Sequence, residues 1–288
     1  MIDLHAHTTA SDGSYSPSQL VAHAAELGLS AVGVTDHDTI DGWEEALAAS
    51  AETGVEVVPG VELSTSYSGG RFHLLGYYVR PASPIAATLE QIQAARKNRN
   101  GEIFDNLREL GIPIEEALVR RISGSETGQL GRPHFALAMI ELGYVKSTQE
   151  AFDKYLADGK PAYATKTVLS PQDAISQIHQ SGGVAIWAHP PLNKSFSPDE
   201  LEEECGRWVA WGLDGIETHY SRYTTEQATW AEKVRLKFGL LAGGGSDFHG
   251  TSKPDVKLGQ TETGAALPDE ILHAIKARRD AIRAVPTS

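Results

Sequence analysis

The sequence predicts an α/β fold of the barrel type that is interrupted by a helical insertion. Short apolar segments alternate with amphipathic ones in about seven strand and helix units. The apolar segments are nearly continuous, which is typical of parallel strands buried on both faces. From residue 83 to 166 the strand signals give way to helical ones. A chain of 288 residues is long enough for one barrel or for two smaller domains.

The first third supplies four predicted strands and two helices. The opening strand lies in MIDLHAH and is followed by a helix in SPSQLVAHAAELG, where Ser16 is the N-cap, Pro17 takes the first helical position and Gln19 completes a capping box. SAVGVTDHD reads as a buried strand, and the helix in DGWEEALAASAETG ends at Gly54. VEVVPGVELST and RFHLLGYYV are two further strands.

The rest of the chain divides into a helical part and a second α/β part. PIAATLEQIQAARKNRNGEIFDNLRELG is expected to form one long amphipathic helix, although KNRNG weakens its middle. Shorter helices are expected in RPHFALAMIELGY and STQEAFDKYLADG. Strand and helix then alternate again through VAIWAHP, LDGIETHY and LLAGGGSDFHG to a final helix in PDEILHAIKARRDAI. We therefore expect a catalytic barrel in 1–82 and 167–288 and an inserted helical cap subdomain in 83–166.

Charge and cysteine content limit the class of protein. The net charge of −13 argues against a duplex DNA or anionic membrane partner. Residues 80–166 nevertheless carry 12 Lys and Arg against 11 Asp and Glu, so the negative charge lies in the remainder. No apolar run approaches the roughly 20 residues that span a bilayer, and no signal peptide is evident. The single cysteine, Cys205, can form no internal disulfide, so a cytoplasmic location is expected.

Residues that bind metals recur at predicted strand ends. Six of the 11 histidines take part, and six separate strand ends are involved. Catalytic groups of barrel enzymes gather at the carboxyl face because every strand points there. The pattern therefore predicts a metal site among the acids and imidazoles at these ends: His5, His7, Asp12, Asp36, His37, Asp38, Glu62, His73, His189, Asp247 and His249. Of these, Asp36 and Asp38 are expected to orient His37 and neighbouring loops rather than to bind metal directly. The alternative for the first pair is a strand that exposes two imidazoles by chance.

These motifs resemble those of a known family. DLHAHTTASDG, GVTDHDT, GVELST, FHLLGY, AHP and SDFH occur in the order found in the PHP (polymerase and histidinol phosphatase) superfamily of metal-dependent phosphoesterases. The resemblance covers the length of the barrel and is strongest to the branch that includes nucleotide phosphatases. It implies a distorted (β/α)7 TIM-like barrel with two or three divalent metal ions, commonly manganese, iron or zinc.

The resemblance also implies how the ligands are shared. A first ion would be bound by His5, His7, Glu62 and Asp247. A second would share Glu62 and add His73 and His189, and a third would use Asp12, His37 and His249. Family members often have histidine at the position of Asp12, and a carboxylate there favours manganese or magnesium over zinc.

Charge at the site favours a phosphate substrate. With three divalent ions, three carboxylates and one bridging hydroxide, the centre carries a charge near +2, whereas with two ions the charge is near 0. Full loading would attract a phosphate dianion. Bound ions lower the pKa of water toward about 7 and so supply hydroxide for attack on phosphorus.

Four residues are candidates for contacts with the substrate. Arg132 in GRPHFA could bind two phosphate oxygens at once, and the alternative is an exposed or helix-capping arginine. His134 could bind the same phosphate or protonate the leaving oxygen, or simply be a packed histidine. His219 and Tyr220, at the end of GIETHY, could line the substrate pocket.

The expected activity is phosphomonoester hydrolysis of a small phosphorylated metabolite, most simply a nucleotide. The resemblance points to nucleoside 3′,5′-bisphosphates or nucleoside monophosphates. Removal of nucleotides from the 5′ end of short RNA is an alternative, as is histidinol phosphate hydrolysis. A different class, the amidohydrolases, also begins with His-x-His but commonly has a carboxylated lysine where Glu62 stands here. A non-catalytic module stabilised by metal is a further alternative.

Overall fold

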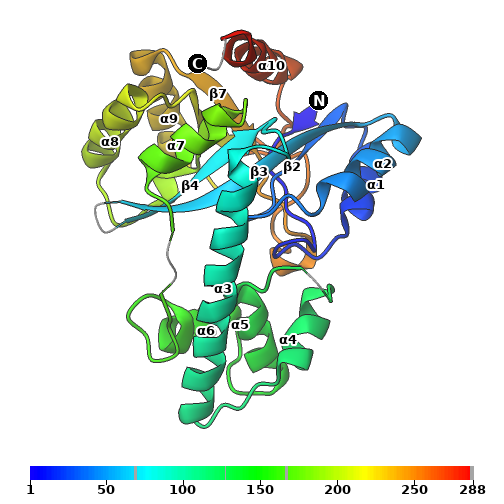
Figure 1. Ribbon diagram of the computed structural model, residues 1–288, viewed down its shortest axis with the longest axis vertical. Coiled ribbons are helices and arrows are strands. Elements are labelled where there is room, and N and C mark those ends of the chain that lie inside the picture. Colours follow the sequence, from blue (N-terminus) through cyan, green and yellow to red (C-terminus); the bar gives the residue numbers. More distant parts are fainter. Residues whose placement is uncertain (68–69, 127, 166–167, 286–288) are drawn as a thin grey trace.

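The protein consists of a seven-stranded barrel from which a group of helices projects (Figure 1). The structure, a computed structural model, describes residues 1–67, 70–126, 128–165 and 168–285. The strands follow one another around the sheet in chain order: β1 (Ile2–Asp3), β2 (Ala31–Val34), β3 (Glu56–Tyr67), β4 (Gly70–Tyr77), β5 (Val184–Ala188), β6 (Gly215–Tyr220) and β7 (Leu241–Gly245).

Hydrogen bonds just beyond β1 and β7 nearly close the barrel. The N–H of Asp247 donates to the carbonyl of His5 at 2.8 Å, and the N–H of His7 donates to that of Phe248 at 2.9 Å. The segments that carry the first and last predicted metal ligands are therefore direct neighbours. The prediction of a distorted α/β barrel is confirmed.

One strand departs from the expected parallel arrangement. β4 pairs antiparallel with both β3 and β5, whereas the other neighbouring strands are parallel. Only two residues separate β3 from β4, and a parallel crossover needs a dozen or more. The chain must therefore reverse direction there, and the expectation of a uniformly parallel barrel is wrong at this strand.

Helices cover the outside of the barrel, and the first two begin or end at the capping residues that the sequence predicts. Ser16 and Gln19 form the capping box of α1, and Gly54 ends α2 with a φ of 78°. The helices around the barrel are α1 (Pro17–Glu26), α2 (Trp43–Thr53), α7 (Pro171–Gln180), α8 (Pro198–Ala210), α9 (Thr225–Phe238) and α10 (Asp269–Ala284), with short 3₁₀ turns at Pro190–Leu192 and Gly250–Ser252. Among the described residues, no helix is both long and apolar enough to cross a membrane.

The remaining helices form a second group with a hydrophobic core of its own (Figure 1). They are α3 (Pro84–Glu109), α4 (Glu116–Ser123), α5 (Arg132–Glu141), α6 (Thr148–Ala151) and a π-helical turn, Phe152–Leu156. α3 is unbroken despite KNRNG, and it contributes Ile85 and Leu89 to the barrel core but Ile103 and Leu107 to the second core. We propose that 83–166 is the inserted subdomain and that α3 ties it to the barrel. Residues 166 and 167, at the proposed boundary, lie outside the described residues.

Candidate metal centre and adjoining cavities

The first two histidines extend from β1 to the rim of the barrel. Ile2, Leu4 and Ala6 are buried on the core side, and the rings of His5 and His7 lie 5.2 Å apart. Gly245 approaches from β7 so closely that a Cβ atom there would lie 2.4 Å from the backbone nitrogen of His5. Glycine is therefore required for β7 to bring Asp247 alongside the histidines.

Glu62 of β3 lies at the middle of the cluster. Its carboxylate oxygens are 2.8 to 3.3 Å from one nitrogen of each of five imidazoles, those of His5, His7, His37, His73 and His189. The carboxylate is fully buried. Five imidazoles around one buried carboxylate are expected where the nitrogens and oxygens share cations.

Hydrogen bonding does not account for this convergence. Five of the facing atoms are buried and lack a hydrogen-bond partner among the described residues: His5 Nε2, His7 Nε2, His37 Nδ1, His73 Nδ1 and Glu62 Oε2. Buried polar atoms without partners are costly and need an explanation. A set of imidazole and carboxylate donors suits divalent metal ions, so the residues present fit the metals that the fold family uses.

The ligand atoms form three overlapping groups, each within 4.8 Å. They are His5, His7, Glu62 and Asp247; His7, Asp12, His37 and His249; and His37, Glu62 and His73. The first matches the expected first set. In the others, His7 joins Asp12, and His37 lies with His73, while His189 Nε2 remains 3.0 Å from Glu62. All nine predicted residues therefore lie close together, but His7 and His37 each belong to two of the three groups.

His73 reaches the rim in a different way from the other histidines. It was predicted at a strand's carboxyl end, but it is the fourth residue of β4, which runs antiparallel. The amino end of an antiparallel strand lies beside the carboxyl ends of its neighbours. The reversal of β4 therefore places His73 at the same rim.

The pKa values of the clustered side chains indicate which of them carry a proton when no metal is bound. Burial disfavours the anion, yet His37, His73 and His5 hold the pKa of Glu62 well below its usual value. Burial lowers the pKa of His37 to about 3, so this imidazole is neutral. Burial also opposes the charge on His7, but Asp247 and Glu62 raise its pKa to about 9. A metal ion bound by His7 would therefore displace a proton from it near neutral pH.

Side chains behind the ligands hold them in place. Glu217 of β6 lies 3.0 Å from Nδ1 of His5 and accepts the backbone N–H of His189 at 2.7 Å. Tyr220 and Lys253 donate to one oxygen of Asp247 at 2.6 Å each. Carboxylate contacts of this kind orient metal-binding imidazoles. Our sequence reasoning missed both Glu217 and Lys253, although Glu217 lies in the GIETHY segment that it singled out.

Strained backbone accompanies two of the ligands. His189 and Asp247 have φ values of 33° and 57°, in the left-handed region that non-glycine residues rarely adopt. Such strain persists where the surroundings dictate it and is concentrated at functional sites.

The aspartates on either side of His37 bind loops. Asp36 accepts the backbone N–H of Thr8 at 2.8 Å and the hydroxyl of Ser11 at 2.5 Å. Asp38 accepts the N–H of Ser64 at 2.8 Å and is paired with Arg96 of α3. The second contact connects the metal-binding loop to the helical subdomain.

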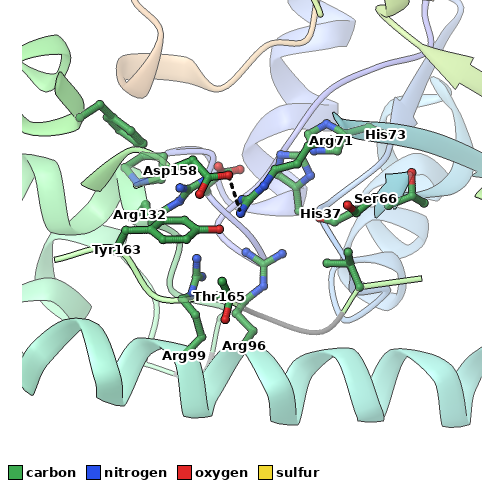
Figure 2. A pocket seen from close by; sticks show the side chains of 17 residues that line it. His37, Ser66, Arg71, His73, Arg96, Arg99, Arg132, Asp158, Tyr163 and Thr165 are labelled. Carbon is green, nitrogen blue, oxygen red and sulfur yellow. Dashed lines mark ion pairs between the residues drawn. The ribbon is translucent and has the colours of Figure 1, made fainter. Parts of the chain in front are cut away.

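The nine predicted metal ligands are called the metal cluster below. A cavity of about 430 Å³ adjoins this cluster and is lined by four arginines, Arg71, Arg96, Arg99 and Arg132. Figure 2 shows their guanidinium groups directed into it from different elements, with Arg96 and Arg99 rising from α3. His37, His73 and Asp12 line the same cavity. Of the four arginines, our sequence reasoning identified only Arg132.

Arg99 is the most confined of these cations. It is 5% exposed, and its Nε and Nη2 atoms have no hydrogen-bond partner among the described residues. Burial and then the nearby charges of Arg96 and Arg132 lower its pKa to about 9. Arg71, by contrast, pairs with Asp158 at 3.6 Å. A buried guanidinium among like charges, with two nitrogens lacking a partner, suits an anionic ligand.

Arg132 is held over aromatic rings at the cavity wall. Its guanidinium lies 5.6 Å from the ring centre of Tyr163 and 5.7 Å from that of Phe152, and it donates to the Leu156 carbonyl at 3.1 Å. Burial and then the charge of Arg71 lower its pKa to about 10. The position is compatible with the predicted contact to phosphate.

The other predicted substrate residues lie in different surroundings. His134 is buried, accepts the N–H of Gly131 at 3.1 Å and is not among the described residues that line the cavities. His219 contacts Glu262 at 3.1 Å and is likewise not among those lining residues. Tyr220 does face the metal cluster. A register shift between Glu217 and His219 breaks the alternation along β6, so Glu217 and Tyr220 point to the site instead of His219.

A second cavity, of about 540 Å³, opens on another side of the same cluster. It shares His37, His73, Arg71 and Arg132 with the first, and Leu192, Asn193, Lys194 and Lys253 line its further wall. The metal cluster therefore adjoins two spaces.

The fold and the site together define a metal-dependent phosphoesterase, a hydrolase of phosphoester bonds. The PHP domain family model matches residues 3–112. The chain is 32% identical over 279 residues to the 3′,5′-nucleoside bisphosphate phosphatase of Chromobacterium violaceum, covering 96% of this chain and 97% of that protein. The chain belongs to the PHP family.

Two further relatives support this placement. A 5′-3′ exoribonuclease of Haemophilus influenzae is 36% identical over 248 residues, or 86% of this chain and 89% of that protein. A solved structure from Bifidobacterium adolescentis, assigned as a metal-dependent phosphoesterase, superposes with a TM-score of 0.86 at 30% identity, covering 96% of each chain. The predicted family and the predicted enzyme class are confirmed.

Proposed function

We propose that this protein is a phosphomonoesterase that hydrolyses a nucleotide and that a nucleoside 3′,5′-bisphosphate fits the site best. The observation on which this proposal rests is the arginine cavity beside the metal cluster. One phosphate at the metals and another at the arginines would use both features. The bisphosphate phosphatase of Chromobacterium violaceum, similar over almost the whole chain, supports the same substrate class.

Within this proposal the nine clustered residues are the metal ligands. His5, His7, Glu62 and Asp247 would bind one ion, Glu62 with His73 and His189 a second, and Asp12, His37 and His249 a third. The geometry also allows His7 to contribute to the third position and His37 to the second. Manganese is the preferred ion, because three carboxylates favour a hard cation.

The chain's own residues would perform three tasks, beside the chemistry of the bound metal ions. Glu217, Tyr220 and Lys253 hold His5 and Asp247 in their orientations. Arg132 and Arg99 bind phosphate oxygens that do not react. Bound metal ions supply activated water and neutralise charge on the reacting phosphate. The walls formed by the helical subdomain limit the site to small molecules or single-stranded ends.

Removal of nucleotides from the 5′ end of short RNA is the second candidate. The arginine cavity adjoins the metal cluster and would accept the 5′-terminal nucleotide beside a diester at the metals. The similarity to the exoribonuclease of Haemophilus influenzae supports it. We also propose a cytoplasmic location, on the ground that the only cysteine, Cys205, is a buried free thiol.

A substrate panel with the manganese-loaded protein tests the proposal. Phosphate release would be measured from adenosine 3′,5′-bisphosphate, AMP and histidinol phosphate, and shortening from a 5′-phosphorylated oligonucleotide. The bisphosphate should have the highest kcat/KM, at least tenfold above AMP, because it alone can occupy the metals and the arginines together. Equal values for AMP and the bisphosphate would contradict the proposal.

A further inference from the structure

A third cavity lies along α3, next to the arginine cavity. It is a groove of about 320 Å³ between α3, α4 and the segment 128–130. The α3 residues that line it lie between Gln93 and Phe104, and Figure 1 shows α4 to the right of the lower part of α3. Arg96 lines both the groove and the arginine cavity, so the two spaces share a wall.

The groove continues the positive charge of the arginine cavity. Lys97 and Arg120 line it together with Arg96, and the one acidic residue among its lining residues, Glu116, is paired with Arg120 at 3.0 Å. Lys97 is exposed and has no ion pair among the described residues. Together the two cavities present six cationic side chains, which suits a ligand with phosphates at intervals rather than one small anion.

Two amide side chains in the groove wall have an unused carbonyl oxygen. Asn100 is 7% exposed and donates its amide N–H to the Leu130 carbonyl at 3.0 Å, while Gln129 donates to the Asp38 carbonyl at 2.9 Å. These bonds fix which end of each amide is the oxygen. Asn100 Oδ1 and Gln129 Oε1 are left without a hydrogen-bond partner among the described residues.

Unpaired acceptors beside an aromatic ring match the edge of a nucleobase. The amino and imino groups of bases donate hydrogen bonds, and Phe104 adds an apolar surface to the same groove. A phosphate alone would use the cations but would be repelled by carbonyl oxygens. The lining therefore combines a phosphate-binding edge with a base-binding wall.

We propose that this groove binds the second nucleotide of a single-stranded oligonucleotide whose 5′-terminal phosphates occupy the arginine cavity. The inference rests on the proposed function, because it needs phosphates of a nucleotide at the arginines. Arg96 would lie between the first and the second nucleotide. A single nucleoside bisphosphate would leave the groove empty.

Binding of a cleavage-resistant probe tests the inference. The probe is a 5′-phosphorylated tetranucleotide with phosphorothioate linkages and a 3′ fluorophore, added to the manganese-loaded protein. Lys97→Glu should weaken its binding about tenfold and reduce the dependence of log Kd on log salt by about 0.7 per lost phosphate contact. Because the side chain of Lys97 is exposed, its substitution should not disturb folding. The matched control is Lys146→Glu, since Lys146 is also exposed but lies outside the groove.

The base contact is tested on the probe itself. A tetranucleotide that lacks only its second base should bind the wild-type protein at least fivefold more weakly. Equal Kd values for Lys97→Glu and Lys146→Glu, or for the intact and abasic probes, would overturn the inference.

Turnover of adenosine 3′,5′-bisphosphate separates this inference from the proposed function. The kcat/KM of Lys97→Glu for the bisphosphate should equal that of wild type. If the wild-type protein hydrolyses the bisphosphate but the Kd of the probe does not change in Lys97→Glu, only the groove assignment fails. If wild type does not hydrolyse it, the proposed function fails.

Discussion

Replacement of Arg99 by methionine should stabilise the protein and weaken its substrate binding at the same time. Arg99 is 5% exposed, and two of its guanidinium nitrogens have no partner among the described residues. Methionine retains the length of the side chain but removes an unpaired buried charge. An unsatisfied buried polar group costs about 1 to 3 kcal/mol, and more when it is charged. A domain of this size gains about 2 °C in Tm per kcal/mol, so Arg99→Met should raise Tm by several degrees.

The same substitution should raise KM for the bisphosphate. A hydrogen bond to a charged group contributes about 1.5 to 3 kcal/mol, which corresponds to a loss of affinity of about 10- to 100-fold. The value of kcat should change little, because in the proposed function Arg99 binds the phosphate that does not react. Thermal melting and steady-state phosphate release measure the two effects. Arg108→Met is the control, since Arg108 lies on the exposed face of the same helix.

Two results would refute this reasoning. A lower Tm for Arg99→Met would show that the guanidinium stabilises the unliganded protein. An unchanged KM would remove Arg99 from the binding of substrate. Inorganic phosphate provides a check that is independent of turnover, because it should raise the Tm of wild type more than that of Arg99→Met.

Three more predictions concern the metal cluster. Asp247→Asn and His189→Ala should each lower kcat by at least about 1,000-fold with a near-native circular dichroism spectrum, and near-normal phosphate release by either would contradict the proposed ligand set. In the metal-free protein the raised pKa of His7 stabilises the fold below pH 6.5, and this stability is lost as pH rises through about 9. With a chelator present, Tm should fall as the pH rises through about 9, and with metal bound it should not. A Tm that does not change with pH in the presence of chelator would refute this prediction. Gly245→Ala should cost several kcal/mol, because its Cβ would lie 2.4 Å from the backbone of His5; a wild-type urea midpoint would show that β7 can move.

Much of the local structure could be predicted from the sequence because it depends on neighbouring residues. The capping box of α1 and the glycine end of α2 use residues within one turn of each other. The metal cluster was also predictable, because parallel strands bring their carboxyl ends to one rim. No side-chain detail was needed for that inference.

Other features depend on a break in regular geometry. The reversal at β4 determines how His73 reaches the rim, and the register shift in β6 turns Glu217 toward His5 and His219 away. Strand alternation cannot reveal either feature, because it assumes an unbroken pleat in a uniform direction.

The sequence by itself determined most of the elements, the nine residues that gather in one cluster of imidazoles and carboxylates, and the family of metal-dependent phosphoesterases. Only the tertiary structure showed that Arg71, Arg96, Arg99 and Arg132 share one cavity. These arginines come from β4, α3 and α5, and each is unremarkable in its own segment. Their meeting depends on how α3 projects from the barrel, since long-range packing sets where each guanidinium points and whether an acidic partner lies within reach.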